Sequence, residues 1–346
     1  MSAYIIRRIL ISVPLLAAMS FIVFGIIRFP EGDVLAPYRH DPKFAPEEVR
    51  KLEQKYHFDR SFPVQYYHWV KNLFLEWPDP EKAPSTFSGR VRSLLPARVR
   101  LDMGYSFINR KPVATVIGER LVNTLLLSVV SLILVWSVAI PIGTYCAVHQ
   151  YSIGDKILSF VSFIGMSFPG FFLALVLLYL VSLTGVLPTG GLTSTNFDEL
   201  GLLGKALDVA KHMVVPVAVI VTGSMAGMQR LMRGNMLEVL RKQYVTTARA
   251  KGLPENRVIY RHALRNALNP MITIFGYQLS SLLGGVALTE MITSYPGMGS
   301  VMLEAVRAQD IYLVMGSMMI GGVLLIAGNL IADVLLTVSD PRISYE

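Results

Sequence analysis

The sequence predicts an all-α membrane protein with six transmembrane helices and an extracytoplasmic domain between the first and second of them. One observation is composition: 53% of the 346 residues are hydrophobic and only 16% are charged, whereas soluble domains carry about 25% charged residues. A second is the mean hydropathy of +0.49. A third is that the apolar residues gather in runs, several of which reach the roughly 20 residues that a helix needs to cross a bilayer.

Six runs reach or approach this length. In chain order they are residues 9–27, 121–147, 157–184, 213–228, 271–289 and 311–332. The fourth is the shortest, and Gly223 and Gly227 interrupt it. The first follows Arg7 and Arg8, as a signal peptide would, but it is longer than the typical apolar core of about 7–15 residues. No small-x-small cleavage site follows it in residues 21–29, so we expect a retained membrane helix.

Lysine and arginine residues predict the orientation, because they are enriched in cytoplasmic flanks. Arg7 and Arg8 place the N-terminus in the cytoplasm, and six crossings return the C-terminus to the same side. Residues 230–265, between the fourth and fifth runs, then lie in the cytoplasm with nine basic and two acidic residues. The opposite loop, 292–310, carries one basic residue, Arg307. Both N- and C-termini are therefore predicted to be cytoplasmic.

The domain organisation follows from these runs. Residues 1–29 form the first transmembrane helix, 30–118 the extracytoplasmic domain, and 119–346 a five-helix core with a cytoplasmic loop at about 230–270. Within the domain, residues 47–56 and 63–70 have the spacing of short amphipathic helices. Pro78, Pro80 and Pro84, together with several serines, predict an irregular loop in residues 76–100.

Several kinds of chemistry are unsupported by the sequence. The chain has no G-x-x-x-x-G-K-[ST] phosphate loop, so we expect no ATP hydrolysis and no catalytic residues. The histidines at 40, 57 and 68 lack zinc-site spacing, and the single Cys146 excludes a disulfide within the chain, so we expect no metal. The net charge of +8 is explained by the basic loop, which argues against nucleic acid. Glu290 and Asp333 lie at the ends of runs, where an ion-coupled carrier would not place its essential groups.

The basic loop has the most informative local pattern. Ala248 and Gly252 are four residues apart, which predicts two small residues on one helix face, open to the close approach of another backbone. Gly252 suits a helix C-terminus because glycine adopts positive φ without strain. Pro254 suits the first turn of the next helix. A basic stripe then follows at every fourth position, formed by Arg257, Arg261 and Arg265.

This loop resembles the EAA loop of ABC importer permeases, in the form of the dipeptide/oligopeptide/nickel class. The likeness lies in residues 244–253 (YVTTARAKGL) and 261–270 (RHALRNALNP). The general motif opens Glu-Ala-Ala, whereas this chain has Thr246-Thr247-Ala248, so no residue here takes the glutamate's role. Residues 1–27, 101–106, 167–171, 290, 295–299 and 340–342 resemble other parts of that class, with 167–171 matching a kinked third helix. Residues 76–100 look like an insertion.

The resemblance implies a multi-pass subunit of the bacterial inner membrane that imports peptides or similar small solutes. Its implied partners are a second homologous permease, two cytoplasmic ATPase subunits that bind ATP and Mg²⁺, and an extracytoplasmic solute-binding protein; this chain itself would hold no cofactor. The residues implied in ATPase coupling are Ala248, Arg249, Gly252, Leu253 and Arg257. The candidate residues of the substrate path are Gln278, Ser280 and Ser281, although their polar groups could equally pack between helices. Two other classes stay open, namely a secondary transporter or channel, and a membrane-anchored sensor or scaffold.

Overall fold

A computed structural model gives the structure of the chain and describes residues 2–28, 35–39, 45–75, 102–275, 278 and 287–339. The chain divides into two compact units. One unit comprises Met1–Ile5, Thr124–Gly299 and Leu324–Glu346, and the other comprises Ile6–Asn123 and Ser300–Val323. We call them the core unit and the cap unit, and we describe each by itself.

The cap unit contains the elements predicted for the extracytoplasmic domain. Its elements are α1 (Ser2–Arg28) from Ile6 onward, α2 (Ala36–Arg39), α3 (Pro46–Lys55), α4 (Phe62–Leu75), the antiparallel pair β1 (Tyr105–Ser106) and β2 (Lys111–Pro112), α6 (Val113–Val148) as far as Asn123, α15 (Met298–Arg307) from Ser300 onward, and α16 (Ile311–Ser339) as far as Val323. The helices predicted at 47–56 and 63–70 are thus confirmed as α3 and α4. The loop predicted at 76–100 lies outside the described residues.

An aromatic core and one buried carboxylate hold the cap unit together. The rings of Phe107, Tyr56 and Tyr312 contact one another, with the centroid of Phe107 5.2 Å from that of Tyr56 and 6.3 Å from that of Tyr312. Asp310 is fully buried and accepts hydrogen bonds from the Ser106 hydroxyl at 2.7 Å and the backbone N–H of Leu313 at 3.2 Å. The carboxylate therefore caps the first turn of α16 while it holds the β1 segment beside it.

The helix α6 begins earlier than the sequence predicted. It starts at Val113, inside the predicted domain 30–118, directly after Pro112. Val113, Val116 and Ile117 are almost fully buried in the cap unit, so this turn is stabilised by packing that a search for uncharged residues misses. Glu119, one of the two charged residues directly before the uncharged run, pairs at the surface with Lys111 at 3.2 Å.

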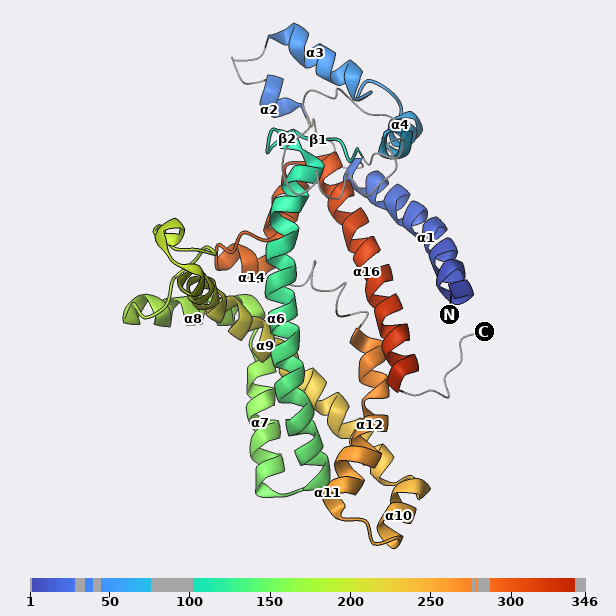
Figure 1. Cartoon of the computed structure of the whole chain (residues 1–346). Coiled ribbons are helices and arrows are strands. Elements are labelled where there is room, and N and C mark those ends of the chain that lie inside the picture. The colour runs from blue at the N-terminus through green and yellow to red at the C-terminus, as the bar shows by residue number, and fades with distance from the viewer. Residues whose placement is uncertain are drawn as a thin grey trace. The chain divides into compact units, whose positions relative to one another are not determined.

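The core unit contains most of the other helices. After α6 come α7 (Ile153–Ser167), α8 (Gly170–Thr184), the 3₁₀ turn η2 (Phe197–Glu199), α9 (Leu202–Leu240), α10 (Gln243–Ala250), α11 (Glu255–Arg257), the π-helix η3 (Val258–Ala263), α12 (Leu264–Ala267), helical residues 269–275, α14 (Ala287–Ile292), and the start of α15 (Met298–Arg307). In Figure 1, α6 and α7 form a hairpin, and α9 packs against α7.

Among the described residues, four helices are long and apolar enough to cross a membrane. They are Ile6–Arg28, Val113–Val148, Leu202–Leu240 and Ile311–Val338, which contain the predicted first, second, fourth and sixth runs. The predicted third run is broken into α7 and α8, which meet at 96°. The break lies at Phe168, which is extended at φ −91° and ψ 133°, because the following Pro169 disfavours a helical residue before it. Most of the predicted fifth run lies outside the described residues.

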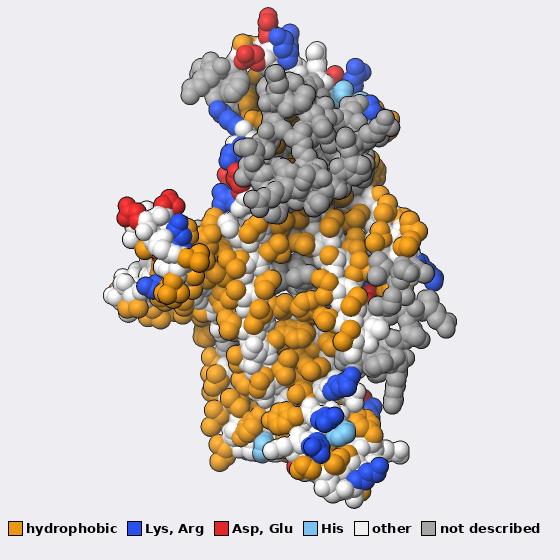
Figure 2. Space-filling model, viewed as in Figure 1, with side chains coloured by type: hydrophobic (Ala, Val, Ile, Leu, Met, Phe, Trp, Pro, Cys, Tyr) orange, Lys and Arg blue, Asp and Glu red, His pale blue; other side chains and the backbone are white. Residues whose placement is uncertain are grey.

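The surface of α6 and α7 is apolar. Figure 2 shows hydrophobic side chains covering this part of the molecule. Exposed residues of this kind on α7 include Ile157, Phe160 and Ile164, which are 56%, 65% and 44% exposed. An apolar surface of this extent is suited to lipid or to another membrane chain and not to water.

Candidate functional site

The loop predicted to couple the protein to an ATPase is a helical element built on the end of α9. We call residues 243–267 the coupling element; it comprises α10, α11, η3 and α12. Its buried side chains form one cluster with α9. The members from the coupling element are Val245, Ala248, Val258, Ile259, Ala263 and Ala267, and those from α9 include Met228, Met232, Met236 and Val239. The element is therefore packed on α9 as part of the same core.

A glycine turn reverses the chain between α10 and α11. The N–H of Gly252 donates to the carbonyl of Arg249 at 2.9 Å, and the N–H of Leu253 donates to the carbonyl of Ala248 at 3.4 Å. Gly252 has φ +73°, in the left-handed region that glycine adopts without strain. The positive φ predicted for Gly252 is confirmed, and Pro254 starts the next helical stretch as its N-cap.

The prediction that Ala248 and Gly252 share one helix face is wrong. The helix ends at Ala250, so the four-residue spacing does not continue along one surface. Ala248 is 7% exposed and packs in the cluster with α9. Gly252 is exposed, and a Cβ built on it would meet no atom within 4 Å. In this chain Ala248 supports the element from inside, and Gly252 shapes its outer tip.

The two ends of the glycine turn are joined by a surface ion pair. The guanidinium of Arg249 donates to the carboxylate of Glu255 at 2.7 Å, and both side chains are about half exposed. Hydrogen bonding from Arg249 lowers the pKa of Glu255. Leu253 lies beside the pair and packs, half-buried, on the cluster below. An exposed pair contributes at most about 1 kcal/mol, so it serves mainly to fix the shape of the turn.

The predicted basic stripe is present on the outside of the element. Arg257, Arg261 and Arg265 are all exposed, whereas Val258 and Ala263 between them are buried. Figure 2 shows Lys and Arg side chains gathered over this end of the core unit. The π-helical residues between Arg257 and Arg265 follow a wider turn than an α-helix, and such turns occur frequently at functional sites.

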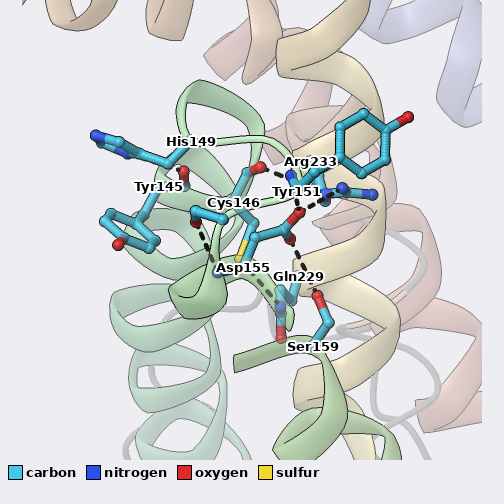
Figure 3. Close-up of polar contacts among 9 residues, drawn as sticks. Tyr145, Cys146, His149, Tyr151, Asp155, Ser159, Gln229 and Arg233 are labelled. Carbon is cyan, nitrogen blue, oxygen red and sulfur yellow. Dashed lines mark hydrogen bonds and ion pairs between the residues drawn. The ribbon is translucent and has the colours of Figure 1, made fainter. Parts of the chain in front are cut away.

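A buried polar network ties α9 to the hairpin of α6 and α7 (Figure 3). Arg233 on α9 donates to the carboxylate of Asp155 on α7 at 2.8 Å and to the carbonyl of Cys146 on α6 at 3.5 Å. Asp155 is 4% exposed and also accepts from the N–H of Tyr151 at 2.9 Å and the hydroxyl of Ser159 at 3.3 Å. The arginine thus joins three helices through one charged contact.

The network continues along α9 by one turn. Gln229 donates to the sulfur of Cys146 at 3.6 Å, and its carbonyl oxygen accepts from the hydroxyl of Ser162 on α7. Glycines allow the helices to approach here: a Cβ at Gly143 would lie 2.7 Å from the Cβ of Met232, and one at Gly165 would lie 2.7 Å from Thr222. The end of α9 that carries the coupling element is therefore fixed to the hairpin.

Sequence reasoning did not identify Asp155 or Arg233 as partners. The third uncharged run begins at residue 157, which leaves Asp155 in a predicted loop, and the sequence does not distinguish Arg233 from the eight other basic residues of 230–265. A local signal was present: Ser152 followed three residues later by Asp155 is a helix-start pattern. The structure confirms that start, since the hydroxyl of Ser152 accepts from the N–H of Asp155 at 3.1 Å.

The candidate path residue Gln278 is held by an aromatic pair. Its carbonyl oxygen accepts from the indole N–H of Trp136 on α6 at 3.0 Å, and Trp136 contacts Phe275 edge-on at 5.7 Å. Trp136 was not identified from the sequence. Ser280 and Ser281 lie outside the described residues.

Comparisons with known proteins agree with this architecture. Residues 139–345 match the family described as the binding-protein-dependent transport system inner membrane component, and residues 1–128 match the N-terminal region of such membrane components. The chain belongs to this family. The resemblance to ABC importer permeases is thereby confirmed, and the chain is a multi-pass inner-membrane transport subunit and not itself an enzyme.

Individual relatives match the permease along its whole length. This chain is 37% identical to the oligopeptide transport system permease protein AppB of Bacillus subtilis (strain 168). It is 31% identical to the dipeptide transport system permease protein DppB of Alkalihalophilus pseudofirmus and 30% identical to DppB of Escherichia coli (strain K12). Each comparison covers all of this chain and all of the relative.

Proposed function

We propose that this permease is one of two membrane subunits of an ATP-driven importer that carries di- or oligopeptides. The cargo is supported by the relatives, whose names specify oligopeptide or dipeptide transport over their full length. The other expected components are a second homologous permease, two ATPase subunits that bind ATP and Mg²⁺, and a solute-binding protein. The family's dependence on a binding protein supports the last of these.

The observation that carries the mechanism is the continuity between the coupling element and the membrane helices. The ATPase subunits dock on the exposed tip, which Arg249, Gly252 and Arg257 form, while Leu253 and Ala248 fix the tip to the core. Because the element and α9 share one buried cluster, movement of the tip on ATP binding moves α9. Arg233 and Asp155 pass that displacement to α6 and α7.

The substrate passes between the two permeases, and Gln278 lies on its path. A glutamine held at one end by Trp136 presents its amide in a fixed direction, and an amide forms hydrogen bonds with peptide groups in either sense. Phe275 and Trp136 add an apolar surface against which side chains of different peptides can pack.

Partner dependence tests the proposed assembly. The purified chain alone is expected to hydrolyse no ATP, because it lacks a phosphate loop. Expressed with the products of neighbouring genes, it is expected to copurify with one second permease and two ATPase subunits, as measured by native mass spectrometry. A transport-competent complex containing this chain alone would contradict the assembly.

The orientation is a separate part of the proposal, with both termini and the coupling element in the cytoplasm. Single cysteines at Gln54 on α3 and Asn256 on α11, both exposed, report on the two sides in a Cys146→Ser background. An impermeant maleimide is expected to label Gln54→Cys on intact spheroplasts and Asn256→Cys only after lysis. Labelling of Asn256→Cys on intact cells would contradict the orientation.

A further inference from the structure

A buried carboxylate lies between α14 and α15, and the coupling mechanism described above does not use it. Glu290 on α14 is fully buried. Its carboxylate accepts from the hydroxyl of Thr124 on α6 at 2.8 Å and from the backbone N–H of Gly299 at 2.8 Å. The same Thr124 oxygen accepts from the N–H of Met298 at 2.6 Å. Glu290 and Thr124 together therefore bind the first N–H groups of α15, where a negative charge is favoured.

The turn from 293 to 299, with the sequence Thr-Ser-Tyr-Pro-Gly-Met-Gly, closes tightly around this carboxylate. A Cβ at Gly297 would overlap the carboxylate of Glu290, and one at Gly299 would lie 2.6 Å from the Cα of Ala287. The two glycines are required here for space. The turn and the carboxylate are consequently fitted to each other.

This turn, which we call the Glu290 turn, rests on several membrane helices. Tyr295 is 1% exposed and packs with Leu127 of α6 and with Met213 and Val217 of α9. A Cβ at Gly190, in the loop after α8, would lie 3.0 Å from the carbonyl oxygen of Thr293. The turn thus joins α6, α9, α14 and the loop after α8.

The Glu290 turn also follows the expected substrate path along the chain. Gln278 precedes α14, and Glu290 lies near the end of α14. The helix α6, which binds Glu290 through Thr124, also carries Trp136, the hydrogen-bond partner of Gln278. Loss of a hydrogen-bonded partner from a buried charge is more costly than loss from a neutral pair, so the carboxylate is suited to hold one defined position.

We propose that Glu290 is a positioning residue for transport. Through Thr124 and Gly299 it holds the Glu290 turn on α6, which also carries Trp136, the partner of Gln278, and on α9, which carries the coupling element. The proposal rests on the proposed function in that Gln278 must lie on the path; the placement of the turn itself does not depend on the cargo.

The test compares the whole transporter containing wild-type chain, Glu290→Gln, Thr124→Val or Thr124→Ser. Glutamine has the shape of glutamate but carries an NH₂ group that cannot accept from Thr124 or Gly299. Valine removes the hydroxyl at similar volume, and serine restores it. Glu304→Gln, on the exposed side of α15, is the matched control for the same chemical change. If Glu290→Gln does not assemble, Thr124→Val decides the question.

Two readouts are measured on each complex in a Cys146→Ser background. One is the labelling rate of Thr293→Cys, at a position that is 2% exposed in the closed turn. The other is the uptake of radiolabelled dialanine and trialanine per ATP hydrolysed in proteoliposomes. For Glu290→Gln and Thr124→Val we expect labelling about fivefold faster or more and uptake per ATP about fivefold lower. The concentration of binding protein for half-maximal rate should not change. Thr124→Ser and Glu304→Gln should behave as wild type.

The remaining outcomes separate the claims. Unchanged labelling of Thr293→Cys in both variants would overturn the proposal outright. Faster labelling with unchanged uptake per ATP would show that Glu290 stabilises the turn but has no effect on transport, and would overturn its role in transport. If the wild-type complex takes up neither peptide, the proposed function fails, and faster labelling would still support the placement of the turn by Glu290.

Discussion

Replacement of Arg233 by methionine is expected to destabilise the core unit by about 3–5 kcal/mol, the cost of leaving a buried charge unpaired. The carboxylate of Asp155 forms an ion pair with the guanidinium of Arg233 at 2.8 Å, and the side chain of Asp155 is only 5% exposed. Methionine keeps much of the volume of arginine but donates no hydrogen bond. Thermal unfolding of the purified complex in detergent measures the effect.

Two further variants test whether the loss of stability comes from the unpaired charge of Asp155. Arg241→Met changes an exposed arginine at the end of α9 and should change the unfolding temperature little. The double variant Arg233→Met with Asp155→Asn should recover much of the loss, because the unpaired charge is gone and the amide oxygen still accepts from Tyr151. Equal destabilisation by Arg241→Met would show that the buried pair has no special role.

Gly252→Val is expected to reduce peptide uptake roughly tenfold while the membrane helices stay intact. Gly252 has φ +73°, and a branched residue held there costs about 1–3 kcal/mol. Because a Cβ at this site meets no atom within 4 Å, the effect comes from the backbone and not from crowding. The turn would relax to another shape, and the tip would no longer fit the ATPase subunits.

The control for this prediction is Gly252→Asn. Asparagine adopts the left-handed region more readily than other residues, so it should retain most uptake and most ATPase binding in a pull-down. If valine and asparagine both behaved as wild type, the shape of the turn would not matter for coupling. If both variants abolished uptake equally, coupling would require the absence of a side chain at position 252 and not a positive φ.

The membrane class was predictable because it depends on long apolar runs, and four of the six predicted runs lie within single helices long enough to span a membrane. The bend after Ser167 was harder to predict from the sequence. Residues 157–184 read as one uncharged run, and Pro169 predicts a break but not its angle of 96°. That angle depends on packing between helices, which hydropathy along the chain does not describe.

In the coupling element, too, features set by neighbouring residues could be predicted from the sequence, whereas contacts between distant residues could not. The positive φ of Gly252 and the exposed Arg257 stripe follow from local sequence, and both are present. Ala248 was wrongly predicted to share an open face with Gly252, because its inward direction depends on where the helix ends and on how the element packs against α9. The pairs Asp155–Arg233 and Thr124–Glu290 join residues 78 and 166 positions apart, which no local pattern connects.

ATP-driven uptake of a radiolabelled peptide by the reconstituted complex is the decisive measurement for peptide import by this permease. Proteoliposomes containing this permease, its second permease and the ATPase subunits would receive the peptide-loaded binding protein outside and ATP inside. We expect accumulation of dialanine or trialanine that requires ATP and the binding protein, and that falls with Gly252→Val but not with Gly252→Asn. Accumulation without ATP, or an equal rate when this chain is omitted, would contradict it.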